Sequence, residues 1–174
     1  IFPCYYFFGG QMSANNSHNF IIKEIEFIKL IISSNIPFLG ICLGAQFLAK
    51  YLGSTIFQNQ RKLSEIGFYE IYPSDQSYDM FKKNNFFYQF YTKGFNIPQN
   101  FTPLAFGDKF KYQAFKYKKC YVFQFHPEVN FRMHIRWLFL ILLKNPMIFL
   151  KNGAQNIFIK FFFDFNKINQ CPHG

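Results

Sequence analysis

A short apolar segment that leads into a helical segment through the pentapeptide GICLG constrains the fold of this chain most. Pro37–Ile41 has the composition of a buried strand, and Ala45–Leu52 has the apolar spacing of a helix that stops at Gly53. Cys42 stands between them, with one glycine two residues before it and another two residues after it. The sequence therefore predicts a strand, a sharp turn that carries the cysteine, and a helix.

The residues before this unit predict the same order of elements. Cys4–Phe8 is an aromatic strand that runs into Gly9 and Gly10, and Phe20–Ser33 is predicted to be a helix because its isoleucines recur on one face. These isoleucines are Ile21, Ile22, Ile25, Ile28 and Ile32. Strand, helix, strand and helix in succession begin a parallel sheet. We therefore expect a three-layer α/β fold in which helices flank a mostly parallel central sheet.

The middle of the chain predicts a small antiparallel β region. Short β-type segments are separated there by Gly, Pro, Asn and Asp, and they comprise Glu65–Tyr72, Phe86–Tyr91, Pro103–Phe106, Tyr112–Phe115 and Cys120–Phe125. The last segment is expected to return a strand to the main sheet. Helices are predicted from Phe131 to Asn145 and over Ala154–Phe165. No repeat or linker divides the sequence, so one domain is predicted over residues 1–174.

Composition argues against several classes of function. Half of the residues are hydrophobic and 23% are aromatic, which is incompatible with a disordered chain. The formal net charge of +10 is scattered in ones and twos, with KYKK at 116–119 as the densest group, so nucleic acid is not an expected partner. The apolar run Trp137–Leu143 is far shorter than the roughly 20 residues of a membrane span, so no membrane association is expected.

The cysteines indicate a reducing compartment. Cys4, Cys42, Cys120 and Cys171 show neither CxxC nor metal-type spacing, so neither a disulfide framework nor a metal site is expected. We expect a cytoplasmic protein without a cofactor.

Cys42 has two interpretations. It is either a buried structural thiol at the end of a strand or a nucleophile on a strained elbow, where glycines leave room for a substrate. A helix N-terminus at this point would favour a thiolate and would offer backbone N–H groups to an anion. The GxCxG pattern by itself leaves the two interpretations equally open.

A nucleophilic cysteine requires a base, and His126 is the best candidate. It follows an apolar strand in the phrase FQFHPEV, and the carboxyl ends of such strands are where α/β proteins place their sites. Glu128 lies two residues further on and can orient an imidazole. The remaining histidines lie in a polar loop, on a predicted helix and in the C-terminal tail.

These segments together resemble the class I glutamine amidotransferases, whose catalytic triad is Cys, His and Glu. GICLGAQ at 40–46 and QFHPE at 124–128 carry the resemblance, and GGQMSAN at 9–15 is similar to the family's GGPMS. EIGF at 65–68 is similar to EIGW, and QAF at 113–115 is similar to the family's QAF before QFHPE. The stand-alone proteins related to the amidotransferase part of GMP synthase are the most similar. The resemblance implies a flavodoxin-like sheet.

The resemblance also implies a role for each matching residue. Cys42 would attack the side-chain amide of L-glutamine, His126 would transfer the proton, and Glu128 would hold the imidazole. The backbone N–H groups of Gly10 and Leu43 would form the oxyanion hole. The glutamine pocket would be lined by Gln46 and by the backbone of Gly44. Ammonia would pass to a synthetase or another acceptor enzyme.

The sequence departs from the family in two places. The family has a further βαβ unit before the double glycine, and we expect this chain to lack it. In YQFYTKGFNIP, residues 88–98, Tyr91 replaces the usual histidine and Lys93 replaces an acidic residue. Glu65 is expected to be a surface carboxylate despite the EIGF match. A truncated non-catalytic remnant or partner-binding module of the same fold, and hydrolysis of another γ-glutamyl amide, therefore remain as alternatives.

Overall fold

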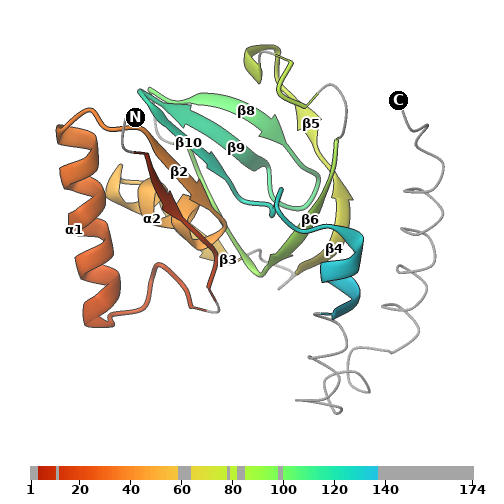
Figure 1. Ribbon diagram of the computed structural model, residues 1–174, viewed down its shortest axis with the longest axis horizontal. Helices are drawn as coiled ribbons and strands as arrows, with labels where there is room; N and C mark the ends of the chain where they lie inside the picture. Colours follow the sequence, from red (N-terminus) through yellow and green to blue (C-terminus); the bar gives the residue numbers. More distant parts are fainter. Residues whose placement is uncertain are drawn as a thin grey trace. The chain divides into compact units, whose positions relative to one another are not determined.

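A six-stranded sheet forms the framework of the first unit of the protein (Figure 1). Its strands, in spatial order, are β1 (Tyr5–Phe7), β2 (Phe38–Ile41), β10 (Cys120–Phe123), β9 (Tyr112–Tyr117), β8 (Thr102–Phe106) and β5 (Tyr72–Pro73). β1, β2 and β10 are parallel, and β9, β8 and β5 continue the same sheet with antiparallel pairing. The antiparallel region is thus largely an extension of the parallel sheet.

The computed structural model describes residues 4–10, 12–58, 64–77, 79–81, 85–97 and 100–136 of the 174. The chain divides into two compact units, Ile1–Pro127 and Glu128–Gly174. The single-domain organisation and the lack of an N-terminal βαβ unit both stay predictions.

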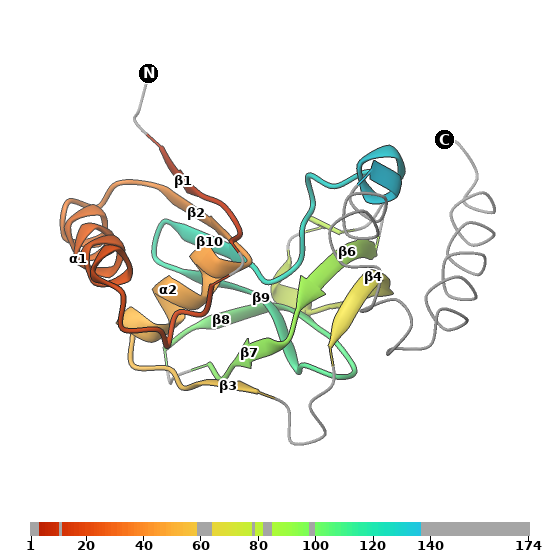
Figure 2. The same ribbon diagram turned by 90° about the horizontal axis from the view of Figure 1, so that it is seen from below.

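Two helices, α1 (Asn19–Ser33) and α2 (Leu43–Tyr51), pack beside the parallel strands (Figures 1 and 2). One buried apolar cluster joins them to the sheet. It contains Ile21, Ile28 and Ile31 of α1, Phe47, Leu48 and Ala49 of α2, and Phe38 and Val122 of the strands. Ile21 and Ile28 of the predicted isoleucine face are buried in this core, and Ile25 and Ile32 pack against it. Ile22 was wrongly assigned to this face, since 50% of it is exposed, and Ile31 is buried in its place. The predicted α/β class with a sheet flanked by helices is confirmed.

α2 begins at Leu43, two residues before the predicted Ala45, and ends at Tyr51, one residue before the predicted Leu52. Gly53 follows it with φ 86°, a left-handed conformation that glycine adopts without a steric penalty. The N–H of Ser54 reaches back 2.9 Å to the carbonyl of Ala49, so one of the last helical carbonyls is satisfied.

Two antiparallel pairs of strands lie outside the main sheet (Figure 2). β3 (Ile56–Gln58) pairs with β7 (Lys93–Phe95), and β4 (Glu65–Glu70) pairs with β6 (Phe86–Tyr91). A 3-10 turn, Asp75–Ser77, follows β5. β3 and β7 were not predicted, because each has only three residues and no alternating pattern.

The predicted segment Glu65–Tyr72 divides between two sheets. β4 ends at Glu70, and β5 begins at Tyr72 in the main sheet. Ile71 between them is fully buried, and its N–H donates to the carbonyl of Asn85. A buried bend therefore replaces the continuous strand that the apolar pattern predicts.

The second unit begins with a helical turn. Residues 131–136 are helical, and Asn130 caps them because its side-chain oxygen accepts the N–H of Met133 at 3.0 Å. The predicted start of this helix at Phe131 is confirmed. Its predicted continuation to Asn145 and the helix predicted over Ala154–Phe165 lie outside the described residues.

Candidate active site

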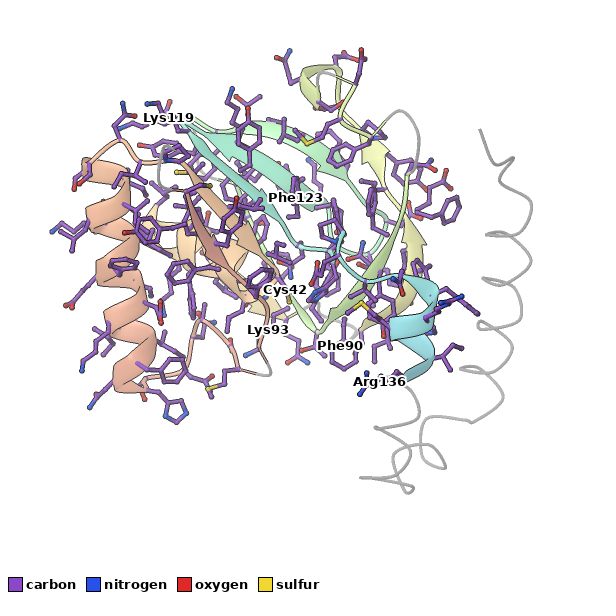
Figure 3. The ribbon with its side chains drawn as sticks, viewed as in Figure 1. Cys42, Phe90, Lys93, Lys119, Phe123 and Arg136 are labelled. Carbon is purple, nitrogen blue, oxygen red and sulfur yellow. The ribbon has the colours of Figure 1, made fainter. Side chains whose placement is uncertain are left out.

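Cys42 occupies the turn between β2 and α2 (Figure 3). Its backbone has φ 53° and ψ −101°, a region that residues with a side chain rarely adopt and that costs about 1–3 kcal/mol. The N–H of Cys42 donates a 2.7 Å hydrogen bond to the carbonyl of Phe123, and its carbonyl accepts a 3.2 Å bond from the N–H of Gln46. The side chain is 5% exposed. Cys42 therefore sits on the strained elbow that the sequence predicts.

The glycines on either side of Cys42 allow three elements to approach closely. An ideal Cβ on Gly40 would lie 2.8 Å from the carbonyl carbon of Gly44. One on Gly44 would lie 2.6 Å from the carbonyl oxygen of Phe7 in β1. Any larger residue at these positions would push α2 away from the sheet. The GxCxG pattern is thus a packing requirement of the elbow.

His126 lies next to Cys42, across Gly9. The N–H of His126 donates a 2.8 Å hydrogen bond to the carbonyl of Tyr88 in β6, and the imidazole is 5% exposed. An ideal Cβ on Gly9 would lie 2.8 Å from His126 Cε1 and 3.3 Å from Cys42 Cβ. The loop after β1 therefore touches both side chains, and the structure brings the predicted nucleophile and base together.

Gly10 and Leu43, the residues predicted to form the oxyanion hole, are also neighbours. An ideal Cβ on Gly10 would lie 3.1 Å from Leu43 Cδ2. Leu43 is the first residue of α2, and the first N–H groups of a helix have no acceptor within the helix. Its N–H is thus free of intrahelical bonds beside Cys42.

Gln46 is buried on the first turn of α2, with 4% of its surface exposed. Its Nε2 donates to the carbonyl of Lys93 at 3.3 Å. Its Oε1 has no hydrogen-bond partner among the described residues. A buried amide oxygen without a donor is costly, and it is the kind of group that a polar ligand satisfies. Gly44, also predicted for the glutamine pocket, turns the side that a Cβ would occupy toward β1.

Glu128 is the first residue of the second unit. Its role as the third member of a triad with Cys42 and His126 therefore stays a prediction.

A buried polar network of Tyr91, Glu65 and Gln113 lies beside the cluster that contains Cys42, and the sequence did not predict that these three side chains contact one another. Tyr91 lies in one apolar cluster with Cys42, Ile41 and Phe110. Its hydroxyl contacts the carboxylate of Glu65 and the Oε1 of Gln113, the latter at 2.9 Å. The expectation that Glu65 is a surface carboxylate is wrong, since only 2% of it is exposed. The EIGF and QAF motifs contained two of the three members, but nothing in the sequence joined them to Tyr91.

Burial also raises the pKa of two groups, Tyr91 in the cluster with Cys42 and Cys120 at the far end of the neighbouring strand β10. Desolvation raises the pKa of Tyr91 well above its ordinary value, and the charge of Glu65 raises it further. Tyr91 therefore stays a neutral hydroxyl donor. Desolvation also raises the pKa of the Cys120 thiol to about 11 from 9.0, so this buried thiol remains protonated near neutral pH.

Two further kinds of site are absent from the described part of the chain. It contains no group of three or more His, Cys, Asp and Glu side chains that would hold a metal ion. Within the same residues, no helix combines the length and apolar character of a membrane span.

A family model described as glutamine amidotransferase class-I matches residues 7–145 of this chain. A protein from Pyrococcus furiosus, named as one subunit of a glutamine-hydrolysing GMP synthase, is 32% identical over 135 residues, which cover 73% of this chain and 67% of the relative. The protein of the same name from Pyrococcus abyssi is 29% identical over 103 residues, 58% of this chain and 55% of the relative. The chain thus spans only part of the length of these relatives.

The fold is likewise similar to a solved structure. A glutamine amidotransferase from Thermotoga maritima aligns with a TM-score of 0.72 at 28% sequence identity. The alignment covers 91% of this chain and 74% of that chain.

Proposed function

The chain belongs to the class I glutamine amidotransferase family, and we propose that it hydrolyses L-glutamine to glutamate and ammonia with Cys42 as the nucleophile. The observation that carries the proposal is the strained elbow at Cys42 with His126 across Gly9. Strain of this kind at a residue with a reactive side chain is characteristic of functional sites.

In the proposed reaction the sulfur of Cys42 attacks the side-chain amide carbon of glutamine, and His126 takes the thiol proton. The tetrahedral intermediate breaks its C–N bond, and the same proton goes from His126 to the leaving ammonia. A thioester remains on Cys42. Water then attacks the thioester and gives a proton to His126. The C–S bond breaks, and His126 returns this proton to the sulfur, which gives glutamate and the regenerated thiol.

Four further residues have assigned roles in this proposal. The N–H groups of Gly10 and Leu43 stabilise the oxyanion, and removing one such donor in comparable sites costs about 3–4 kcal/mol. Gln46 offers its buried Oε1 to the amino or amide N–H groups of the substrate. Glu128 orients the imidazole of His126.

The ammonia is proposed to pass to a synthetase on another polypeptide. The support is that the Pyrococcus relatives are named as subunits of a glutamine-hydrolysing GMP synthase. A cytoplasmic location, inferred from the cysteine pattern, stays a prediction.

Ammonia release from L-glutamine tests the nucleophile directly. Cys42→Ala is expected to lower the rate by at least ~10³-fold. Cys4→Ala is the matched control, because Cys4 is an exposed free cysteine and its loss should leave the rate within about twofold. Ammonia release that survives Cys42→Ala would refute the assigned nucleophile. A wild-type protein that is folded but releases no ammonia would favour the non-catalytic alternative.

A further inference from the structure

The Tyr91 side chain is held between a polar network and the candidate nucleophile. Tyr91 ends β6 and is 7% exposed, and it shares a buried cluster with Cys42 and Phe110. Its ring meets the ring of Phe110 edge to face, with centroids 5.2 Å apart and an interplanar angle of 70°. Phe110 itself lies close to β7, because an ideal Cβ on Gly94 would lie 2.5 Å from Phe110 Cδ1. The rings therefore have little room to move.

The hydroxyl end of Tyr91 is fixed by groups from two other strands. Its oxygen lies within hydrogen-bond distance of Glu65 Oε2 in β4 and of Gln113 Oε1 in β9. Gln113 Nε2 in turn donates to Glu65 Oε2 at 3.3 Å and to the carbonyl of Phe110 at 3.1 Å. The amide of Gln113 thus links the carboxylate of Glu65, the phenol of Tyr91 and the backbone carbonyl of Phe110. A buried polar network of this kind resists movement, because each partial break leaves a polar group unpaired in a medium of low dielectric constant.

Cys42 needs such support more than an ordinary core cysteine does. Its backbone is in a region that persists only where the surroundings hold it, and its side chain has a single torsion with three staggered positions. A nucleophile has to occupy the one position that faces its base. A rigid ring in the same buried cluster as Cys42 limits the positions that the thiol can sample.

We propose that Tyr91 is a positioning residue for Cys42, with its hydroxyl held by Glu65 and Gln113 so that its ring keeps the thiol in the position that exchanges a proton with His126. The proposal rests on the proposed function for its catalytic consequence. Tyr91 itself touches no reacting atom of the substrate in this assignment. The raised pKa of Tyr91 is consistent with this positioning role, because the hydroxyl keeps its hydrogen throughout the pH range of an enzyme assay.

The decisive variant is Tyr91→Phe, which keeps the ring and removes the hydroxyl. Tyr72→Phe is the matched control, because Tyr72 is exposed. Within the described residues its hydroxyl donates to the surface carboxylate of Asp108. Tyr91→Phe is expected to lower kcat by ~10–100-fold with KM within about twofold, as for a displaced reacting group. A loss of packing alone would lower the melting temperature and leave kcat per folded molecule unchanged.

The rate at which iodoacetamide alkylates Cys42 provides a second readout that needs no glutaminase activity. We expect Tyr91→Phe to change this rate by at least threefold and Tyr72→Phe to leave it unchanged. Should wild type release no ammonia, the proposed function fails while the alkylation comparison still tests Tyr91. If Tyr91→Phe melts below the assay temperature, Gln113→Met replaces it, and the same shift in kcat and alkylation is expected. Folded variants with wild-type kcat and alkylation rates would overturn the proposal.

Discussion

Replacing Gly9 with alanine is expected to disable Cys42 and His126 without unfolding the protein. The new Cβ would lie 2.8 Å from His126 Cε1, 3.5 Å from His126 Nε2 and 3.3 Å from Cys42 Cβ. Carbon atoms in ordinary contact are about 3.5–4.0 Å apart, so the imidazole has to retreat by ~1 Å. It is the end of a side chain with two rotatable bonds, and it therefore yields before the backbone does.

The magnitude follows from this displacement. Moving a reacting group by ~1 Å costs about 10²-fold in rate, which corresponds to about 3 kcal/mol of transition-state stabilisation. The added methyl group also overpacks a buried site, which lowers the free energy of unfolding by about 1–3 kcal/mol. Most domains tolerate a loss of this size, so the loss of activity should exceed what the fraction of unfolded protein explains.

The assay compares kcat for ammonia release with unfolding in urea for Gly9→Ala and for Gly53→Ala. Gly53 has φ 86° and nothing within 4 Å of its ideal Cβ, so alanine there strains the end of α2 by about 1 kcal/mol without touching the site. Gly53→Ala is therefore expected to lose stability and keep its kcat. A Gly9→Ala enzyme with kcat within threefold of wild type would refute the placement of this glycine between nucleophile and base, and equal losses of kcat in both variants would assign the effect to stability.

Three further predictions concern stability. The pKa of Cys120 is higher in the folded protein than its reference value of 9.0, so the folded state binds more protons than the unfolded state between pH 9 and about 11. The free energy of unfolding therefore falls as pH rises through this window. In urea titrations at several pH values, Cys120→Ala should show a shallower fall than wild type, and an identical slope would contradict the assignment. Gln89 is fully buried, and neither polar atom of its side-chain amide has a hydrogen-bond partner among the described residues. Gln89→Met should therefore raise the free energy of unfolding by about 1–2 kcal/mol. A lower free energy of unfolding in this variant would indicate that a bound water satisfies the amide. Gly44→Ala places a Cβ 2.6 Å from a backbone oxygen of β1, and a destabilisation of about 2 kcal/mol or more is expected by thermal melting; wild-type stability would show that α2 and β1 separate easily.

Much of the local structure could be predicted because its signals are local. The helix Asn19–Ser33 is predicted by isoleucines at helical spacing. The elbow is predicted by the pentapeptide GICLG between an apolar strand and a helix. Gly53 ends α2 as expected because only a left-handed residue closes the helix there. Each of these features depends on interactions between residues that are close together in the sequence.

Pairing between distant strands could not be predicted in the same way. β3 and β7 pair with each other where both contact α2, and segments of three residues carry no alternating pattern that could predict this. The bend at Ile71 moves the chain from one sheet to another, although the apolar pattern continues across it. The register of strands far apart in sequence depends on the whole core and not on any one segment.

The candidate site also has features that the local sequence predicted and features that depend on contacts between distant segments. The sequence by itself determined that Cys42 stands on a glycine-flanked elbow and that His126 follows a sheet strand, because each signal is contained in a few consecutive residues. Only the tertiary structure decided that Gly9 lies against both of these side chains and that Glu65 is buried against Tyr91 and Gln113. The reason is physical: a carboxylate on a short strand is stable either in water or in a closed set of hydrogen bonds, and the partners that make burial possible come from strands that only folding brings together.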